Sequence, residues 1–415
     1  MLDKVLSPAR RDLAISAALL LAACALAALL AVRSPLGVDY VGPTPTLCDC
    51  AAAPIRALAH GQLHQFVATQ PVMGPLSLVL RAPFAALGLQ LSPGTQLDLY
   101  RFGAFPCLLA AGLLAVYLFG RLRELRRPAL TVALVPVLVA VNPLTTRALR
   151  YGHPEEILAA ALAVAAVLAA GRRRPLLAGL LLGGAFATKQ WALLAILPVL
   201  AAAGDWGERR RLALATGATA VLLIAPVALG DLHRFIQLNH GAGVVGGSVL
   251  PTNIWFPFAS DAQVTVGPSG AATSSRALSM GLGGLTHPLI LALGFGLAAL
   301  WWRYRRADAE PEDALLLLAL VLLLRCLLDP LTNSYYHLPF LMALAAWEGL
   351  RRRGAPLVTV AATLLIGVTI ALAGGGASAA ELNHFYLAWA LPLAGVLGVL
   401  AFRPRTLPAS LAEPA

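Results

Sequence analysis

The sequence is a succession of long apolar runs that are interrupted by short clusters of arginine. Only 12% of the residues are charged and 59% are hydrophobic, whereas a soluble domain carries about 25% charged residues. Apolar runs of about 20 residues can cross a bilayer as helices, because a helix satisfies its own backbone hydrogen bonds. The sequence therefore predicts an all-α, multi-pass membrane protein.

The arginine clusters predict how the chain is oriented. They lie at the ends of apolar runs, as expected for cytoplasmic loops, so the net charge of +11 does not indicate a nucleic-acid partner. Placing every cluster in the cytoplasm gives about twelve spans with both termini inside, beginning with a first span at 13–32 rather than a cleaved signal. We expect one transmembrane domain, 1–403, and a disordered cytoplasmic tail, 404–415. The long external loops would be 33–100 and 230–282.

Two segments do not fit an ordinary span. The run 175–203 has arginines on both sides, which predicts a hairpin of two short helices that turns near Lys189. Segment 72–91 has a short apolar core that contains Arg81 and Pro83. It is predicted to be an interfacial or re-entrant helix of the first external loop. With only short basic turns inside, the function is expected on the extracytoplasmic face.

The first external loop carries two acids, Asp39 and Asp49. A carboxylate at the membrane face can act as a general base that deprotonates an attacking hydroxyl group. Either residue could instead be a solvated loop acid, and Asp49 could cap the helix predicted just after it.

A second group lies in the stretch TTRALRYGHPEE. Arg147 and Arg150 are three residues apart, so they share a helix face and, with His153, could grip a phosphate. They could also be interfacial anchors whose charge is balanced by Glu155 and Glu156.

Two further cations lie within apolar runs. Lys189 is one of only two lysines in the chain, and its compact ammonium group suits a phosphate oxygen or a carboxylate. It could also snorkel to the outer interface. Arg325 is four residues before Asp329, which permits an ion pair. Alternatively, it could complete a phosphate site with the residues that follow, Tyr335, Tyr336 and His337.

The second external loop contains amide, imidazole and aromatic side chains: His233, Arg234, Asn239, His240, Asn253 and Trp255. An indole beside amides can hold a sugar ring, although tryptophan also anchors proteins at membrane interfaces. The sequence has no GK[ST], HExxH or GxSxG motif. ATP-driven work and metallopeptidase chemistry are therefore not indicated, and we expect no cofactor and no metal.

Three features resemble the GT-C class of membrane glycosyltransferases, in particular the polyprenyl-phosphate-mannose-dependent glycosyltransferase family 87. The first loop reads D-x7-A-L-x2-G from Asp49 and continues through Pro75 and Leu76 into LVLRAPFAAL. The second feature is the stretch GLLLGGAFATKQW around Lys189, and the third is RYGHPEE at the start of a span. One departure is Gln70-Pro71-Val72-Met73-Gly74-Pro75, where the family usually shows Tyr-Pro-Pro.

The resemblance implies an enzyme that transfers a hexose, mannose in this family, from a polyprenyl-phosphate sugar to a lipid or cell-envelope glycan. It assigns the general base to Asp49, with Asp39 as the alternate. The lipid phosphate would be held by basic residues, for which the candidates are Lys189, Arg147, Arg150 and Arg325. The alternative function is a secondary transporter or lipid flippase with twelve spans.

Overall fold

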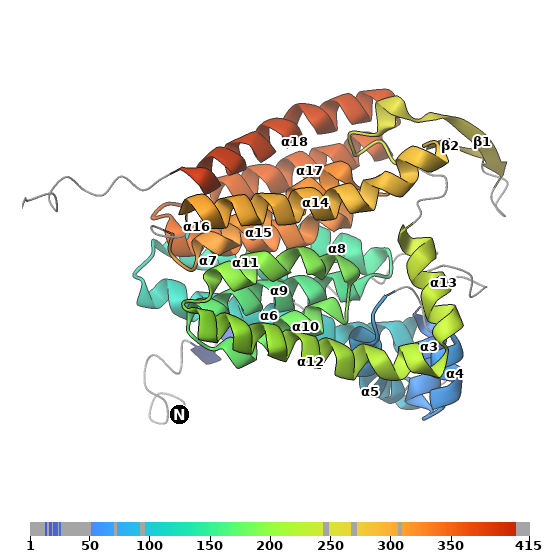
Figure 1. Cartoon of the computed structure of the whole chain (residues 1–415), viewed down its shortest axis with the longest axis horizontal. Helices are drawn as coiled ribbons and strands as arrows, with labels where there is room; N and C mark the ends of the chain where they lie inside the picture. Colours follow the sequence, from blue (N-terminus) through green and yellow to red (C-terminus); the bar gives the residue numbers. More distant parts are fainter. Residues whose placement is uncertain are drawn as a thin grey trace, which may run out of the picture.

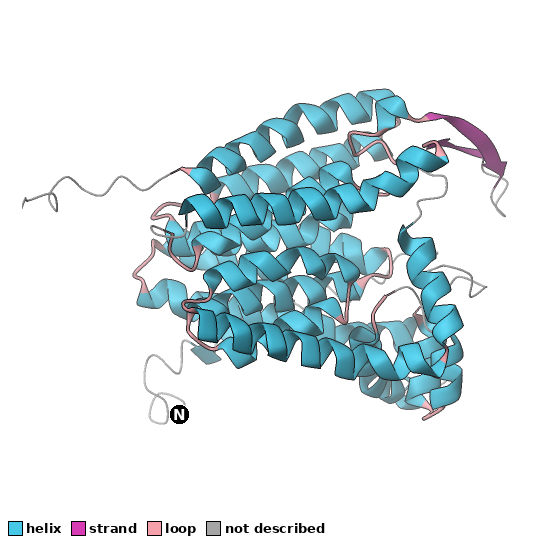
Figure 2. Ribbon diagram, viewed as in Figure 1, coloured by secondary structure: helices cyan, strands magenta, loops and turns pink. Residues whose placement is uncertain are grey.

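The computed structural model describes residues 51–69, 73–91, 96–243, 249–266, 272–305 and 309–403, and parts of a helix between residues 13 and 25. Helices dominate the described chain, as Figure 2 shows, which confirms the all-α prediction. One feature departs from it, a two-stranded antiparallel hairpin of β1 (Ser260–Val266) and β2 (Ala272–Ala277) in the second long loop.

The helices of the main bundle run side by side along the longest axis of the molecule (Figure 1). They are α6 (Gln96–Glu124), α7 (Ala129–Ala140), α9 (Pro154–Gly171), α12 (Trp206–Gly230), α14 (Met280–Arg305), α15 (Asp313–Leu328), α16 (Leu338–Arg351), α17 (Leu357–Gly374) and α18 (Ala379–Phe402). The remaining elements are α3 (Ala52–Ala59), α4 (Leu63–Thr69), α5 (Pro75–Leu91), α8 (Pro143–Arg150), α10 (Pro175–Phe186), η2 (Gln190–Ala195), α11 (Ile196–Ala202), α13 (Leu232–Gly243), η3 (Phe256–Phe258) and η4 (Ser334–His337).

Seven helical stretches of the described chain are long and apolar enough to cross a membrane. They are Leu97–Glu124, Ala129–Arg150, Pro154–Gly171, Trp206–Gly230, Met280–Tyr304, Leu357–Gly374 and Ala379–Phe402. The protein is therefore a multi-pass membrane protein. The number twelve stays a prediction, because α5, α10, α15 and α16 are each shorter than the roughly 20 residues that a span needs.

Burial separates central helices from peripheral ones. In α9, 83% of the apolar stretch is buried, whereas only 22% is buried in α12 and in α17. Helices α15 and α16 are buried along nearly their whole length. The helix α9 therefore lies at the centre of the bundle, and polar groups on it are shielded from lipid by neighbouring helices.

The predicted hairpin at 175–203 is present. Helix α10 stops at Phe186, the chain turns through Ala187–Lys189, and η2 and α11 follow. The two flanks of the hairpin come together, since a Cβ atom on Gly204 would lie 3.9 Å from Arg173 Cζ. Both flanks are therefore on one side of the bundle, as the arginines on each side predict.

The two ends of the bundle differ in what they contain. Helices α3, α4, α5 and α13 and the β hairpin lie at one end (the right in Figure 1), which we call the loop end. Segments far apart in the sequence meet there, because Arg147 Nε donates to Ser334 Oγ and the Asn383 amide donates to the Pro251 carbonyl.

The opposite end, which we call the arginine end, brings together the loops predicted to be cytoplasmic. Arg127 donates to the Leu350 carbonyl, and Arg351 Nε lies 3.1 Å from Asp313 Oδ1. The alternation of loops predicted from the arginines thus agrees with the fold. Which end faces the cytoplasm stays a prediction.

Candidate active site at the loop end

The site is built on the first turn of α9. Gly152 has a φ of +86°, which L side chains rarely adopt, and it reverses the chain just before the helix. Pro154 occupies the first helical position, where its missing N–H costs no hydrogen bond. Glu155 and Glu156 follow in the first turn, where the helix dipole favours carboxylates.

Glu155 is the centre of a buried ion network. Its side chain is fully buried, and its Oε1 atom lies 3.2 Å from Lys189 Nζ and 2.9 Å from His153 Nδ1. The other oxygen, Oε2, lies 3.7 Å from Nη1 of Arg81, which is also fully buried. Two cations from α5 and the α10–η2 turn therefore meet one carboxylate of α9, in an environment that barely screens charge.

Glu156 extends the network toward α15. Its Oε2 atom accepts a 2.8 Å hydrogen bond from the Trp191 indole, and its Oε1 atom is 3.7 Å from Lys189 Nζ. Arg325, in the last turn of α15, lies over the same indole ring, with its Cζ atom 5.4 Å from the ring centroid. The Tyr336 ring is on its other side at 4.4 Å, so aromatic faces hold the guanidinium group by cation–π contact.

One nitrogen of the Arg325 guanidinium group donates no hydrogen bond to any described residue. Its side chain is 7% exposed, and its Nη1 atom is buried without a hydrogen-bond partner. No ion pair joins Arg325 to Asp329 among the described residues, because Asp329 Oδ1 accepts the backbone N–H of Leu331 instead. The ion pair that the i, i+4 spacing permits is thus not formed. A buried guanidinium nitrogen without a partner is costly unless an anion is bound there.

Within the described chain, the cluster holds more positive than negative charge. The cations are Arg81, Arg147, Lys189 and Arg325, and the carboxylates are Glu155, Glu156 and Asp329. One positive charge is left over, which suits an anionic ligand.

The loop before α5 docks directly onto the Lys189 turn. The N–H of Gly74 donates to the Thr188 carbonyl and that of Leu76 to the Ala187 carbonyl, both at 3.0 Å. A Cβ atom at position 74 would lie only 2.2 Å from the Ala187 carbonyl oxygen, so this close approach requires glycine. The first long loop is therefore anchored to the turn that carries Lys189.

Aromatic residues of η4 close the site beside His153. The Tyr335 ring stacks on the imidazole of His153, with centroids 4.9 Å apart. His337 is buried, and its two ring nitrogens lie 3.1 Å from the Ser334 carbonyl and 2.9 Å from the Tyr386 hydroxyl. Nδ1 therefore donates to the carbonyl, and Nε2 accepts from the tyrosine. His337 fastens η4 to α18.

The other predicted site residues are placed differently. Arg147 bonds to Ser334 and Tyr151 at the rim of the cluster, whereas Arg150 is exposed. The Asn253 amide and the Trp255 indole donate to backbone carbonyls, those of Leu250, Pro330 and Leu328, and so fasten the second loop over the end of α15.

Four predicted residues cannot be placed. Asp39 and Asp49 lie outside the described residues, as do the side chains of Asn239 and His240. Their roles stay predictions. Helix α3 begins at Ala52, three residues after Asp49.

The structure adds Arg81, Glu156 and Trp191 to the residues that the sequence pointed to. Each had a signal in the sequence. Arg81 is the one cation in the apolar segment 72–91, Glu156 follows Glu155 directly, and Trp191 is two residues after Lys189. In the part of the chain that is described, no group of three or more His, Cys, Asp or Glu side chains could hold a metal ion.

The fold and the site define a class, that of multi-pass membrane proteins with a buried ionic site at one end. The model of glycosyltransferase family 87 matches residues 72–330, which is more than half of the 415-residue chain. The chain belongs to this family, and the protein is a membrane glycosyltransferase. No curated protein matches the sequence.

Solved structures show a weaker likeness. ArnT from Cupriavidus metallidurans in the apo state has 15% sequence identity and a TM-score of 0.42, covering 85% of this chain and 71% of that one. The archaeal oligosaccharyltransferase AglB from Archaeoglobus fulgidus, solved with an inhibitory peptide and a dolichol-phosphate, has 15% identity and a TM-score of 0.41, covering 94% and 56%. The oligosaccharyltransferase of the same organism in the apo form has 14% sequence identity and a TM-score of 0.41, covering 94% of this chain and 57% of that one.

Proposed function

We propose that the protein transfers a hexose, mannose, from a polyprenyl-phosphate sugar to a lipid or cell-envelope glycan on the extracytoplasmic face. The observation that carries the proposal is the buried Arg325 Nη1, which has no hydrogen-bond partner and belongs to the same cluster as Lys189. In a glycosyltransferase, a buried cationic group of this kind suits the phosphate of a lipid-linked donor.

The reaction needs negative charge to be stabilised on the leaving group. The acceptor hydroxyl oxygen attacks the anomeric carbon, the bond from that carbon to the phosphate oxygen breaks, and polyprenyl phosphate leaves with the bonding electrons. Fixed cations that are already oriented lower the energy of this developing charge. Arg325 and Lys189 would supply them, so the phosphate needs no proton and no metal.

The carboxylates of α9 would keep the cations in position. Glu155 lies between Lys189 and Arg81, and Glu156 contacts both Lys189 and Trp191. Buried cations are tolerated only when partners compensate for lost hydration. We therefore assign Glu155 and Glu156 to positioning rather than to proton transfer.

The proton of the acceptor hydroxyl must go to a base. We propose Asp49 for this role, with Asp39 as the alternate, on the basis of the family motif that begins at Asp49. A carboxylate near the exported face can accept the proton as the new bond forms.

The test is release of free polyprenyl phosphate by the purified protein. Polyprenyl-phosphate-mannose and an acceptor extract would be added to protein in liposomes, and polyprenyl phosphate and mannosylated product would be measured together. We expect equal amounts of both, and loss of both in Asp49→Asn. Asp205→Asn is the matched control, since Asp205 caps α12 at the arginine end.

Each other outcome has a meaning. Movement of the intact donor across the bilayer without release would support the transporter instead. Unchanged release in Asp49→Asn with loss in Asp39→Asn would move the base to Asp39. A glucose donor used as well as the mannose donor would contradict the choice of sugar.

A further inference from the structure

A groove of about 340 Å³ lies between α6, α9 and α10, apart from the ion network around Glu155. Its floor includes Ala161, Ala165 and Ala169, which are spaced four residues apart and therefore share one face of α9. Leucine side chains form the walls, among them Leu113 and Leu177, which are 61% and 42% exposed. The groove is apolar and opens to the side of the bundle.

The length of the groove matches one leaflet of a bilayer. Ala161 and Ala169 are eight residues apart, which corresponds to about 12 Å along a helix. Half of the hydrocarbon core is about 15 Å. An acyl chain from the leaflet at the arginine end would therefore fit along the groove without crossing the midplane.

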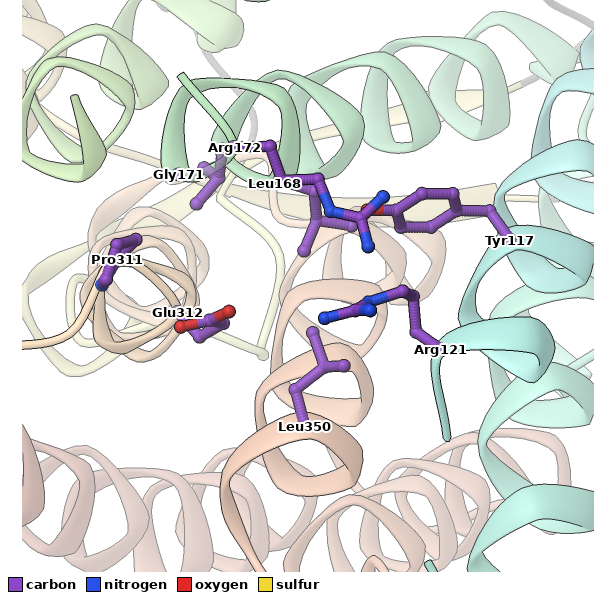
Figure 3. A pocket seen from close by; sticks show the side chains of 9 residues that line it. Tyr117, Arg121, Leu168, Gly171, Arg172, Pro311, Glu312 and Leu350 are labelled. Carbon is purple, nitrogen blue, oxygen red and sulfur yellow. The ribbon is translucent and has the colours of Figure 1, made fainter. Parts of the chain in front are cut away.

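The groove ends at arginines. Arg172 and Arg174 line its end, and the Arg172 guanidinium lies over the Tyr117 ring, with Cζ 4.6 Å from the centroid. Tyr117, Leu168 and Arg172 also line a second, smaller pocket, so the two are adjacent. Figure 3 shows Arg121 and Arg172 pointing into this second pocket, with Glu312 across from them.

The charges around this junction favour an anion. Arg121, Arg172 and one carboxylate, Glu312, line the second pocket, and Arg174 lines the end of the groove. Glu124 pairs with Arg121 on the surface. Three cations against two carboxylates leave one positive charge at the mouth of an apolar groove. Basic pockets between membrane helices are typical binding sites for anionic lipid headgroups.

We propose that this groove binds one acyl chain of an anionic phospholipid, whose phosphate lies between Arg121 and Arg172. The lipid comes from the leaflet at the arginine end. The site is separate from the Lys189 cluster at the loop end and does not depend on the proposed transfer reaction. Its occupant would hold α6, α9 and α10 together where they are open to lipid.

The experiment is native mass spectrometry of the full-length protein with a mixture of phosphatidylglycerol and phosphatidylcholine of identical acyl chains. We expect one phosphatidylglycerol per monomer, favoured about fivefold or more, because each nearby arginine contributes about 1 kcal/mol. Arg172→Gln should remove about that factor. Arg173→Gln, in the same triplet but outside both pockets, should leave retention unchanged.

The position of the acyl chain is tested by filling the groove. Ala165→Phe should reduce the binding of both lipids, whereas Ala218→Phe, on the exposed side of α12, should not. If Ala165→Phe does not fold, Ala165→Leu adds fewer atoms, and the wild-type comparison of the two lipids needs no variant at all.

Four results would overturn the proposal. Equal retention of the two lipids would remove the headgroup site, and an equal loss in Arg173→Gln would show diffuse attraction only. Displacement of phosphatidylglycerol by equimolar polyprenyl phosphate would assign the groove to the donor's tail. A dimer without bound lipid would assign it to a second copy of the chain.

Discussion

Two ion pairs, one at each end of the bundle, use the same charged residue types in opposite ways. At the loop end, Glu155 and Arg81 are completely buried and reach each other at 3.7 Å. At the arginine end, Arg121 pairs with Glu124 on the surface, where the two side chains are 31% and 63% exposed. Charged side chains that are exposed to water can have no role other than to orient the chain in the membrane. Buried charge carries a desolvation cost, and such residues are usually functional.

The largest difference should appear when one carboxylate is removed at each end. Glu155→Leu removes the carboxylate that lies closest to the buried Arg81 and Lys189, and removing one member of a buried ion pair costs about 3–5 kcal/mol. Glu124→Leu breaks an exposed pair, which is worth at most about 1 kcal/mol. The free energy of unfolding in detergent measures both. Similar losses in the two variants would contradict the contrast between the ends.

The sequence identified several residues of the site, but not which of these residues contact one another. Lys189 stood out as one of two lysines, in a predicted hairpin, and Glu155 was named with Glu156 as a carboxylate that could balance Arg147 and Arg150. Their contact joins residues 34 positions apart and depends on how α9 packs against the α10–η2 turn, which periodicity does not specify. For Arg325 the sequence left two alternatives open, and the i, i+4 alternative requires that the helix continue to Asp329. Here α15 ends at Leu328, and Asp329 turns away to cap the following backbone.

The fold, too, could be predicted only in part. Arginine clusters predicted which loops meet, and the hairpin at 175–203 is present. The number of spans could not be read from hydropathy, because buried helices such as α16 are apolar all round and yet shorter than a span.

The next contrast concerns activity. Arg325→Gln removes the buried donor without a partner, so we expect kcat/KM for the lipid-linked donor to fall about 10- to 100-fold. That corresponds to the roughly 1.5–3 kcal/mol of a hydrogen bond to a charged group. Arg121→Gln at the arginine end should change it less than twofold. Steady-state transfer assays measure kcat/KM for both variants. Equal values for the two would refute a role for Arg325 in donor binding.

The docking of the first loop can be broken by a single methyl group. Gly74→Ala places a Cβ atom 2.2 Å from the Ala187 carbonyl oxygen, and overpacking of this kind costs about 1–3 kcal/mol. The clash should separate the loop from the Lys189 turn and lower transfer activity. Gly217→Ala has open space around its Cβ atom and serves as the control. Full activity in Gly74→Ala would show that the docked loop is dispensable.

The smallest effect compares two buried tryptophans. Trp191→Phe loses the hydrogen bond to Glu156 Oε2, and we expect a loss of about 1–2 kcal/mol in unfolding free energy. Trp347 is buried to a similar degree, but its indole nitrogen has no partner. Trp347→Phe should therefore cost less. The reverse order in thermal unfolding would argue against the Glu156 contact as a stabilising bond.

The central claim is that the buried cations of the loop end hold the phosphate of the lipid-linked donor. The most direct test is a cryo-electron microscopy structure of the protein in a lipid nanodisc with polyprenyl phosphate. The account predicts a phosphate oxygen within hydrogen-bond distance of Arg325 Nη1 and Lys189 Nζ. Density for the phosphate at Arg172, with the Arg325 cluster unchanged from the arrangement described above, would contradict it.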